Sequence, residues 1–426
     1  MNTILLLIIV LITLEYVLER VLYGLNARDF GKPLPAELAG IYDDEKYQKQ
    51  QEYSKAKYKM GIVTATISLV VELVAFGFGL FGWLDGVLRE ALGGIGDNTI
   101  LFTVLLSLLF FVIVAVVNEI IDIPSEYYST FVIEERFGFN KSTKKLFWID
   151  QLKGIVVAVI IASILISLVT WIFAEIPEWF WLLAWGVLAL FQIFILMFYS
   201  NIIVPLFNKQ TPLEEGELRS KIEAFAEKAG FKLNNIYVMD SSKRSTHANA
   251  YFTGLGSKKR IVLYDTLIKQ LTPDEIVAVL AHEIGHYKKR HTMTMLIESL
   301  ASTLVMFFIL GWALSSPELS IALGGPAQPV FHLGLIAFAM LYSPISTILG
   351  IVTNISSRKH EYEADAFAAS YGLANDLISA LKKLSSESLS NLQPHKALVF
   401  VHFSHPTLLQ RIQKLGTRDN EQGTRF

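Results

Sequence analysis

The sequence predicts a polytopic α-helical membrane protein with seven transmembrane helices and a small α+β domain that holds a metal ion. Of its 426 residues, 52% are hydrophobic and only 18% are charged, and the mean hydropathy is +0.44. Soluble domains carry about 25% charged residues, so much of this chain must lie in lipid. The motif His-Glu-Ile-Gly-His at residues 282–286 indicates the metal, and a polar stretch between apolar segments indicates the domain.

Seven stretches are long and apolar enough to cross a bilayer as helices, which takes about 20 residues. They are residues 3–24, 61–84, 100–123, 154–175, 179–205, 293–315 and 330–355. The first stretch contains Glu15 and Glu19, has no basic start and shows no small-residue cleavage site. We therefore interpret it as an uncleaved span rather than a signal peptide.

Lysine and arginine are distributed unequally among the connections. Residues 25–60 carry seven and residues 125–153 carry five, whereas Arg89 is the only one between the second and third spans. Basic loops face the cytoplasm, so we predict an outside N-terminus and a cytoplasmic C-terminus, as an odd number of spans requires. The membrane would be the endoplasmic reticulum in a eukaryote or the inner membrane in a prokaryote.

The spans divide the chain into four regions. These are a transmembrane region of five helices (1–206), a cytoplasmic domain with the motif helix (207–292), a transmembrane hairpin (293–355) and the C-terminal part of that domain (356–426). Within the domain, the sequence predicts an amphipathic helix at 214–229 and short strands at 235–239, 250–253 and 260–264. Thr272, followed by Pro273 and two acidic residues, predicts the start of the helix that carries the motif.

Histidines four residues apart lie on one face of a helix, one turn from each other. His282 and His286 can therefore bind one Zn²⁺ through neutral imidazole nitrogens. Glu283 lies between them, where a carboxylate can take a proton from a metal-bound water. The chain has no cysteine, so any zinc must be held by histidine and carboxylate.

A third ligand is expected after the seventh span. Glu361 follows that span closely and His286 precedes the sixth closely, so both emerge at the same face of one helical hairpin. This arrangement predicts a site of two histidines and one glutamate with an open position for water. Asp365 lies one turn beyond Glu361, where it can accept the second ring N–H of a zinc-bound histidine. Glu363 is a rival ligand two residues away.

These residues resemble the type 1 CAAX prenyl proteases, which are integral-membrane zinc endopeptidases with seven helices around a large chamber. The resemblance covers nearly the whole chain. It rests on residues 282–286 with His291 and Thr292, and on the segments 244–252, 357–365 and 405–411. It implies one Zn²⁺ per chain, held by His282, His286 and Glu361, with Glu283 as general base.

The resemblance also implies that His405 and Arg411 reach the site from the C-terminal segment, with His405 stabilising the oxyanion. An extended substrate would lie along Asn249, Ala250, Tyr251 and Phe252. The family substrate ends in Cys-aliphatic-aliphatic-X, with an isoprenylated cysteine, and loses its last three residues. The expected partners are thus a prenylated peptide or protein and the lipid bilayer, and a net charge of −2 argues against a nucleic-acid binder.

Two other functions stay open at this point. One is a bacterial quality-control zinc protease of the membrane, although such proteases have fewer helices. The other is a transporter or channel with a structural zinc site, although closed structural sites use four protein ligands. Three residues also have plainer explanations: His405 could cap a helix, Arg411 could pair with a carboxylate, and His291 is not expected to be a ligand.

Overall fold

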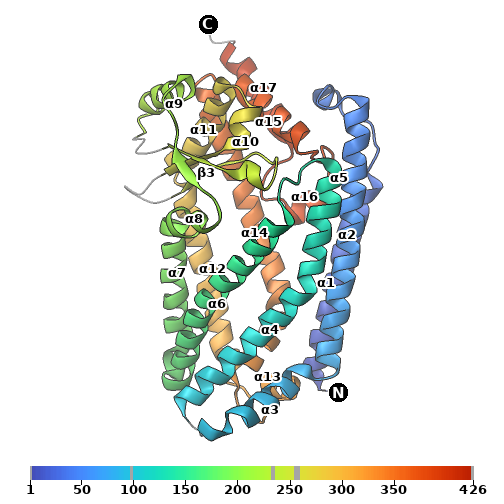
Figure 1. The fold of residues 1–426 in the computed structure, drawn as a ribbon, viewed down its shortest axis with the longest axis vertical. Coiled ribbons are helices and arrows are strands. Elements are labelled where there is room, and N and C mark those ends of the chain that lie inside the picture. Colours follow the sequence, from blue (N-terminus) through green and yellow to red (C-terminus); the bar gives the residue numbers. More distant parts are fainter. Residues whose placement is uncertain (1, 96–98, 232–235, 254–259, 424–426) are drawn as a thin grey trace.

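The computed structural model describes residues 2–95, 99–231, 236–253 and 260–423. Long helices run the length of the molecule, and a small sheet with shorter helices caps one end (Figure 1). The α-helices are α1 (Thr3–Arg28), α2 (Asp44–Gly77), α3 (Leu80–Leu92), α4 (Ile100–Tyr128), α5 (Glu135–Phe137), α6 (Lys144–Glu175), α7 (Phe180–Ile202), α8 (Val204–Phe207), α9 (Glu217–Lys228), α10 (Asp265–Gln270), α11 (Pro273–Lys288), α12 (His291–Leu314), α13 (Glu318–Ala322), α14 (Phe331–Ser370), α15 (Ala374–Glu387), α16 (Lys396–His402) and α17 (Leu408–Gly423). The short 3₁₀ helices are η1 (Ala36–Leu38), η2 (Gly93–Ile95), η4 (Pro177–Trp179) and η5 (Ser241–Lys243), and η3 (Ser129–Glu134) is a π-helical segment. The strands are β1 (Gln210–Pro212), β2 (Ile236–Met239), β3 (Ala250–Thr253) and β4 (Arg260–Tyr264).

Six helical stretches of the described chain are long and apolar enough to cross a membrane. They are Asp44–Gly77, Ile100–Phe137, Lys144–Glu175, Pro177–Phe207, His291–Leu314 and Phe331–Ser370. The predicted polytopic helical fold is therefore confirmed. Helix α1 also has the length and packs against α2 and α14, but Glu15, Glu19 and Arg20 interrupt its apolar run. Its crossing, which would be the seventh, stays a prediction.

The end predicted for the second span, at residue 84, is wrong. Helix α2 ends at Gly77, and α3 begins at Leu80 and lies across the end of the bundle (Figure 1). Between them Gly79 adopts a left-handed conformation with φ of 66°, which glycine reaches without steric penalty. The apolar run continues through this turn, so hydropathy alone does not show where the chain changes direction.

The sheet contains four strands in the order β1-β2-β4-β3. β2 and β4 are parallel, whereas β1 and β3 pair antiparallel with their neighbours. The predicted strands at 250–253 and 260–264 are observed, and the third is observed from Ile236, since residue 235 lies outside the described residues. β1 was not predicted, because it is only three residues long and ends in proline. β3 is consequently an edge strand among the described strands.

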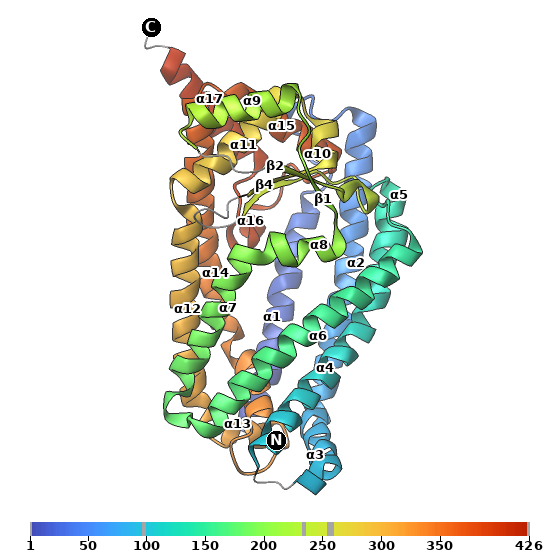
Figure 2. The ribbon, with the colours of Figure 1, turned by 60° about the vertical axis from the view of Figure 1, so that its left-hand side comes forward.

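The domain core lies between this sheet and helices α9, α11 and α15 (Figure 2). Helix α11 begins as predicted at Thr272, whose side chain accepts from the backbone N–H of Glu275 while the Glu275 carboxylate accepts from that of Thr272. Such a capping box satisfies two backbone donors at a helix start. Ile276, Leu280 and Ile284 project from α11 into the core and are almost completely buried. This packing fixes the helix that carries the predicted ligands.

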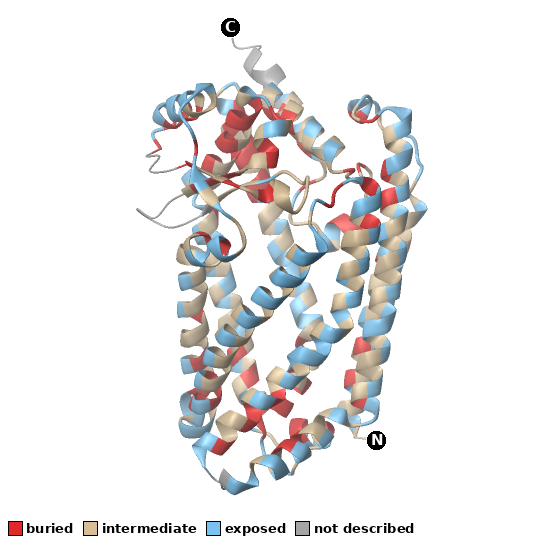
Figure 3. Cartoon of the chain, viewed as in Figure 1, coloured by how far each residue is buried: buried red, intermediate tan, exposed pale blue. Residues whose placement is uncertain are grey.

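At the opposite end of the bundle, four polar residues form a network in which all but Arg89 are buried. The His332 Nε2 is 2.9 Å from Asp85 Oδ1, its Nδ1 is 3.0 Å from Ser107 Oγ, and Arg89 Nε donates to Asp85 Oδ2 over 2.7 Å. The network joins α3, α4 and α14. Buried residues thus gather at the two ends of the molecule, as Figure 3 shows, while the middle of the bundle is more exposed.

The helices leave hollows between them. One of about 520 Å³ is lined mostly by apolar residues of α6, α7, α12 and α14, together with Glu15 of α1. Another of about 820 Å³ lies against α1 and α2. A single chamber that joins these hollows stays a prediction from the family resemblance.

Candidate metal centre

Two helices from distant parts of the chain hold the candidate ligands. His282 and His286 lie on α11, and Glu361 lies on α14. The helices can approach closely because Gly285 faces α14: a Cβ there would lie 3.0 Å from Phe367 Cβ and 3.1 Å from the Ala364 Cα. A glycine at this position therefore sets the separation of the histidines from the glutamate.

The three side chains converge on one point. The His282 Nε2 and His286 Nε2 atoms are 3.2 Å apart, and they lie 3.4 Å and 3.3 Å from the two carboxylate oxygens of Glu361. A tetrahedral ion with ligands at about 2.0–2.1 Å has ligand–ligand separations of about 3.3 Å. The separation of the two nitrogens therefore matches two corners of a zinc coordination tetrahedron, and the Glu361 carboxylate lies close enough to both to supply a third ligand.

Asp365 contacts the first histidine, and Arg411 contacts Asp365. The Asp365 Oδ1 is 2.9 Å from His282 Nδ1, and Arg411 donates to both carboxylate oxygens of Asp365 over 2.9 Å and 2.5 Å. Both side chains are buried. Because His282 Nδ1–H donates to Asp365, its Nε2 carries a lone pair that points at Glu361. Arg411 thus pairs with a carboxylate, the plainer of its two explanations, and this carboxylate holds a candidate ligand.

The second histidine, His286, is the first member of a chain of contacts through His291 to Glu363, which the sequence did not predict. The His286 Nδ1 is 3.1 Å from His291 Nδ1, and the His291 Nε2 is 3.0 Å from Glu363 Oε2. One set of tautomers satisfies these contacts: His286 Nδ1–H donates to His291, and His291 Nε2–H donates to Glu363. His286 Nε2 is then also a bare lone pair. Glu363, the rival ligand, instead accepts from His291.

With these tautomers, the cluster brings two imidazole lone pairs and a carboxylate together. The Glu361 Oε2 atom is buried and accepts no hydrogen bond within the described residues. Buried polar atoms are normally paired, and the Arg411 Nη1 lies 3.7 Å from this oxygen, beyond hydrogen-bond distance. Three acceptors this close repel one another, and a cation among them would relieve that repulsion. The donor set of two nitrogens and one oxygen, with no sulfur, is one that zinc accepts. The residues present fit a zinc ion.

Glu283 lies on α11 beside the cluster, next to His282 in the chain. Burial raises the pKa of the Glu283 carboxyl above its usual range, while His282 and His286 act in the opposite direction. A carboxyl group with a raised pKa binds a proton more readily near neutral pH, which suits a group that first takes a proton and then returns it.

His405 reaches the cluster from the turn between α16 and α17. Its Nε2 is 3.3 Å from the Glu361 Oε1, although 63% of its side chain is exposed. The His405 Nδ1 contacts the hydroxyl of Ser404 at 2.9 Å. The side chain is thus anchored at one nitrogen and presents the other at the open side of the cluster.

The predicted substrate residues lie on and next to the edge strand β3. Asn249 precedes the strand, and its carbonyl accepts from the backbone N–H of Tyr264 over 3.0 Å. Among the residues that the structure describes, β3 pairs with β4 along one edge only, and it also contacts α11, the helix of His282. Its other edge can pair with an extended peptide. The structure therefore brings the predicted ligands, His405, Asp365 and Arg411 together and places the predicted peptide strand beside their helix.

The fold and this site define a polytopic membrane metallopeptidase. Residues 25–209 match the family described as CAAX prenyl protease N-terminal, five membrane helices, and residues 212–419 match peptidase family M48. The chain is 36% identical over 392 residues to the CAAX prenyl protease 1 homolog of Arabidopsis thaliana, which covers 91% of each chain. It is 36% identical over 399 residues to CAAX prenyl protease 1 of Saccharomyces cerevisiae, with 90% of this chain and 88% of that one covered.

A solved structure agrees with these matches. The crystal structure of S. mikatae Ste24p superimposes on 97% of this chain and 99% of its own, with a TM-score of 0.91 and 34% sequence identity. The chain belongs to the CAAX prenyl protease 1 family and is an M48 metallopeptidase embedded in a membrane by several helices. The predicted family and the predicted enzyme class are confirmed.

Proposed function

We propose that the chain is a zinc endopeptidase that removes the last three residues from proteins ending in Cys-aliphatic-aliphatic-X with an isoprenylated cysteine. The observation that carries the zinc assignment is the buried Glu361 carboxylate, whose two oxygens each face one of the two histidines and one of which accepts no hydrogen bond within the described residues. The substrate assignment rests on relatives named CAAX prenyl protease 1, which share up to 36% identity over most of the chain.

One zinc ion per chain would be held by His282, His286 and Glu361, leaving a fourth position for water or substrate. When bound, zinc would polarise the scissile carbonyl and acidify water. Two histidines from one helix and a glutamate from another would supply three of the four zinc ligands. The fourth position would stay open, as it does in catalytic zinc sites. This openness favours an enzyme over a transporter with a structural metal.

The remaining steps belong to the chain's own groups. The free edge of β3 would hold the peptide backbone extended beside α11. The Glu283 carboxylate would take a proton from the attacking water and return it to the leaving amine. The His405 Nε2–H would donate to the oxyanion that forms on the scissile carbonyl. Asp365, with Arg411 behind it, keeps His282 in the tautomer that binds metal.

The orientation follows from the basic connections. Residues 25–60 and 125–153 both lead to the end of the bundle that carries the protease domain (Figure 1). Because basic loops face the cytoplasm, this end and the C-terminus would be cytoplasmic. A site at that end suits a substrate whose lipid lies in the cytoplasmic leaflet.

The test is hydrolysis of matched peptides ending in Cys-aliphatic-aliphatic-X, with and without a farnesyl group, by the purified full chain. We expect cleavage of the farnesylated peptide only. Glu283→Gln should keep its zinc and lose roughly 10²–10⁴-fold in turnover, since general bases contribute that much. Equal cleavage of both peptides would contradict the prenyl assignment, and the absence of any metal-dependent cleavage would contradict the enzyme.

A further inference from the structure

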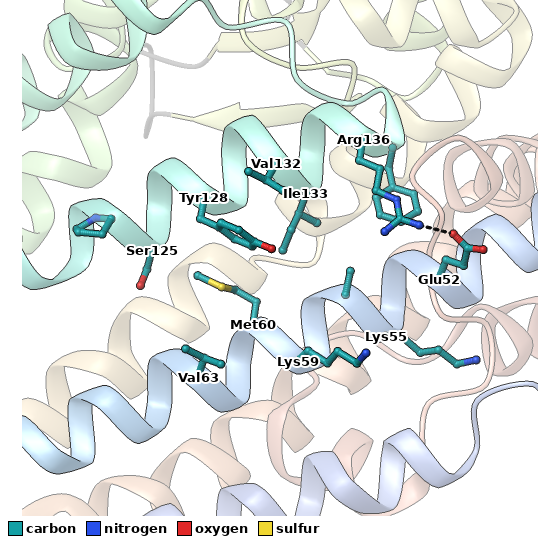
Figure 4. A pocket seen from close by; sticks show the side chains of 13 residues that line it. Glu52, Lys55, Lys59, Met60, Val63, Ser125, Tyr128, Val132, Ile133 and Arg136 are labelled. Atoms are coloured by element: carbon teal, nitrogen blue, oxygen red, sulfur yellow. Dashed lines mark hydrogen bonds and ion pairs between the residues drawn. The ribbon is translucent and has the colours of Figure 1, made fainter.

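A groove separate from the metal centre lies between α2 and the end of α4 with its continuation into η3 and α5. It encloses about 610 Å³, within the usual range of ligand sites. Figure 4 shows side chains of the two helical segments facing one another across it. The lining residues are Glu52, Lys55, Ala56, Lys59, Met60, Val63, Pro124, Ser125, Tyr128, Val132, Ile133, Arg136 and Phe137.

An irregular helix shapes one wall of the groove. Pro124 lies inside α4, and the six-residue π-helical segment η3 follows α4 directly. Proline removes a backbone donor, and a π-helical segment widens the turn. Tyr128 and Val132 of this wall are both exposed although they are large and apolar. The wall therefore presents exposed apolar side chains at Tyr128 and Val132, whereas Ile133 and Phe137 pack against α2.

The end of the groove nearest the protease domain is cationic. Lys55, Lys59 and Arg136 gather there, and Glu52 is the only acidic lining residue. Arg136 Nη2 donates to Glu52 Oε2 over 2.8 Å, which offsets one positive charge (Figure 4). Within the described part of the chain, Lys55 and Lys59 have neither an ion pair nor a hydrogen-bonding partner. Two exposed ammonium groups are thus available to an anion.

The cationic end of the groove and its apolar continuation match the headgroup and hydrocarbon regions of a bilayer. Lys55 and Lys59 lie just before the apolar part of α2, in which Met60 and Val63 line the groove. Lysines at such a boundary hold their charge at the headgroup level while their stems cover apolar surface. Beside the groove α2 is tied to its irregular wall, because Tyr53 donates to Glu134 of η3 over 2.7 Å and Lys57 lies 3.7 Å from the same carboxylate. These two contacts hold the walls of the groove together while Lys55 and Lys59 stay exposed.

We propose that this groove binds one anionic phospholipid, with its phosphate headgroup on Lys55 and Lys59 and an acyl chain along Met60, Val63 and Val132. Charge complementarity selects an anion, and the apolar continuation of the groove selects an anion that carries a hydrocarbon chain. The lipid would brace α2 against the irregular segment η3, whose Glu134 also contacts Tyr53. This inference does not depend on the substrate proposed above.

The test is native mass spectrometry of the purified full chain, titrated with phosphatidylglycerol or with phosphatidylcholine of the same acyl chains. The variant Lys55→Gln/Lys59→Gln removes the two cations. Its control, Lys49→Gln/Lys145→Gln, removes two other exposed lysines that do not line the groove, so the net charge changes equally. We expect preferential binding of phosphatidylglycerol, weakened roughly tenfold or more in the first variant because each basic residue near a membrane contributes to anionic-lipid binding.

A second variant tests the apolar half of the groove. Val132→Trp should fill the space between α2 and η3 and weaken binding of both lipids, while thermal unfolding reports that the chain still folds. Equal losses in the two lysine variants would show a diffuse charge effect and overturn the proposal. Equal binding of the two lipids by the wild-type chain would overturn it as well.

Discussion

Two clusters of histidine, aspartate and arginine lie near opposite ends of the molecule, and α14 contributes to both. In the first, Asp365 links His282 to Arg411; in the second, Asp85 links His332 to Arg89. The histidine and aspartate of each cluster are buried, and each aspartate accepts from both partners. In these contacts the two clusters have the same arrangement.

They differ at the other nitrogen of the histidine. The second nitrogen of His332 is 3.0 Å from the Ser107 hydroxyl, which closes the network. The second nitrogen of His282 instead faces His286 and Glu361, and one Glu361 oxygen accepts no hydrogen bond from the described residues. The comparison teaches that a buried histidine–carboxylate pair is structural when all its atoms are satisfied, and that convergent bare acceptors mark a metal site.

The largest expected effect is the difference in zinc content and turnover between variants of His282 and of His332. His282→Ala should lose the metal and all measurable turnover, because it removes one of three ligands. His332→Ala should keep one zinc per chain and lose about 1–3 kcal/mol of stability, since it leaves buried partners unsatisfied. Elemental analysis and thermal unfolding in one detergent measure both quantities. A normal zinc content in His282→Ala would refute the first assignment.

The two aspartates sharpen the comparison. Asp365→Asn should weaken zinc binding by roughly 10–100-fold, which is the usual effect of removing a carboxylate that orients a ligand histidine. Asp85→Asn should leave zinc affinity unchanged and lower stability, because it uncouples Arg89 and His332. Competition with a chelator of known affinity gives the comparison. If both variants bound zinc equally well, the orienting role of Asp365 would be wrong.

The chain of contacts from His286 through His291 to Glu363 predicts a smaller effect. His291→Gln should weaken zinc binding by roughly tenfold, because His286 loses the partner that fixes its tautomer. His247→Gln is the control, since His247 stacks on Phe139 and is 3.5 Å from Glu134, outside the cluster. The same chelator competition applies. Equal affinities in these two variants would assign His291 to packing alone.

The smallest expected effect concerns the contact between α11 and α14. Gly285→Ala would place a methyl group 3.0 Å from Phe367 Cβ, so the helices must separate by a few tenths of an ångström. We expect a loss of about 1 kcal/mol in stability, typical of mild overpacking, and a severalfold fall in turnover. Gly350→Ala is the control, because a Cβ there meets nothing within 4 Å. Equal turnover in both variants would show that the helix separation is not limiting.

Local spacing explains what could be predicted from the sequence. His282, Glu283 and His286 follow from the period of one helix, and the strands at 250–253 and 260–264 follow from short apolar runs between polar loops. Predicting that Glu361 lies near the two histidines needed one further inference, namely that the sixth and seventh spans are neighbours whose ends emerge at the same face of the membrane. The helical membrane fold and the family are confirmed, whereas the roles of the individual site residues stay predictions.

The rest depended on contacts between distant segments. Asp85, Ser107 and His332 come from three helices, and no spacing relates them. The His291–Glu363 contact joins α12 to α14 and was equally invisible, although both residues adjoin predicted site residues. The break at Gly79 was missed because an apolar run has the same composition in one helix as in two. These features depend on tertiary packing, which periodicity does not encode.

The most direct measurement is zinc X-ray absorption spectroscopy of the purified wild-type chain. The account predicts one zinc per chain, with two imidazole nitrogens and carboxylate or water oxygens at about 2.0–2.1 Å. The same spectrum should lose an imidazole contribution, or vanish with the metal, in His286→Ala. A zinc ion bound without imidazole, or enclosed by four protein ligands, would contradict it.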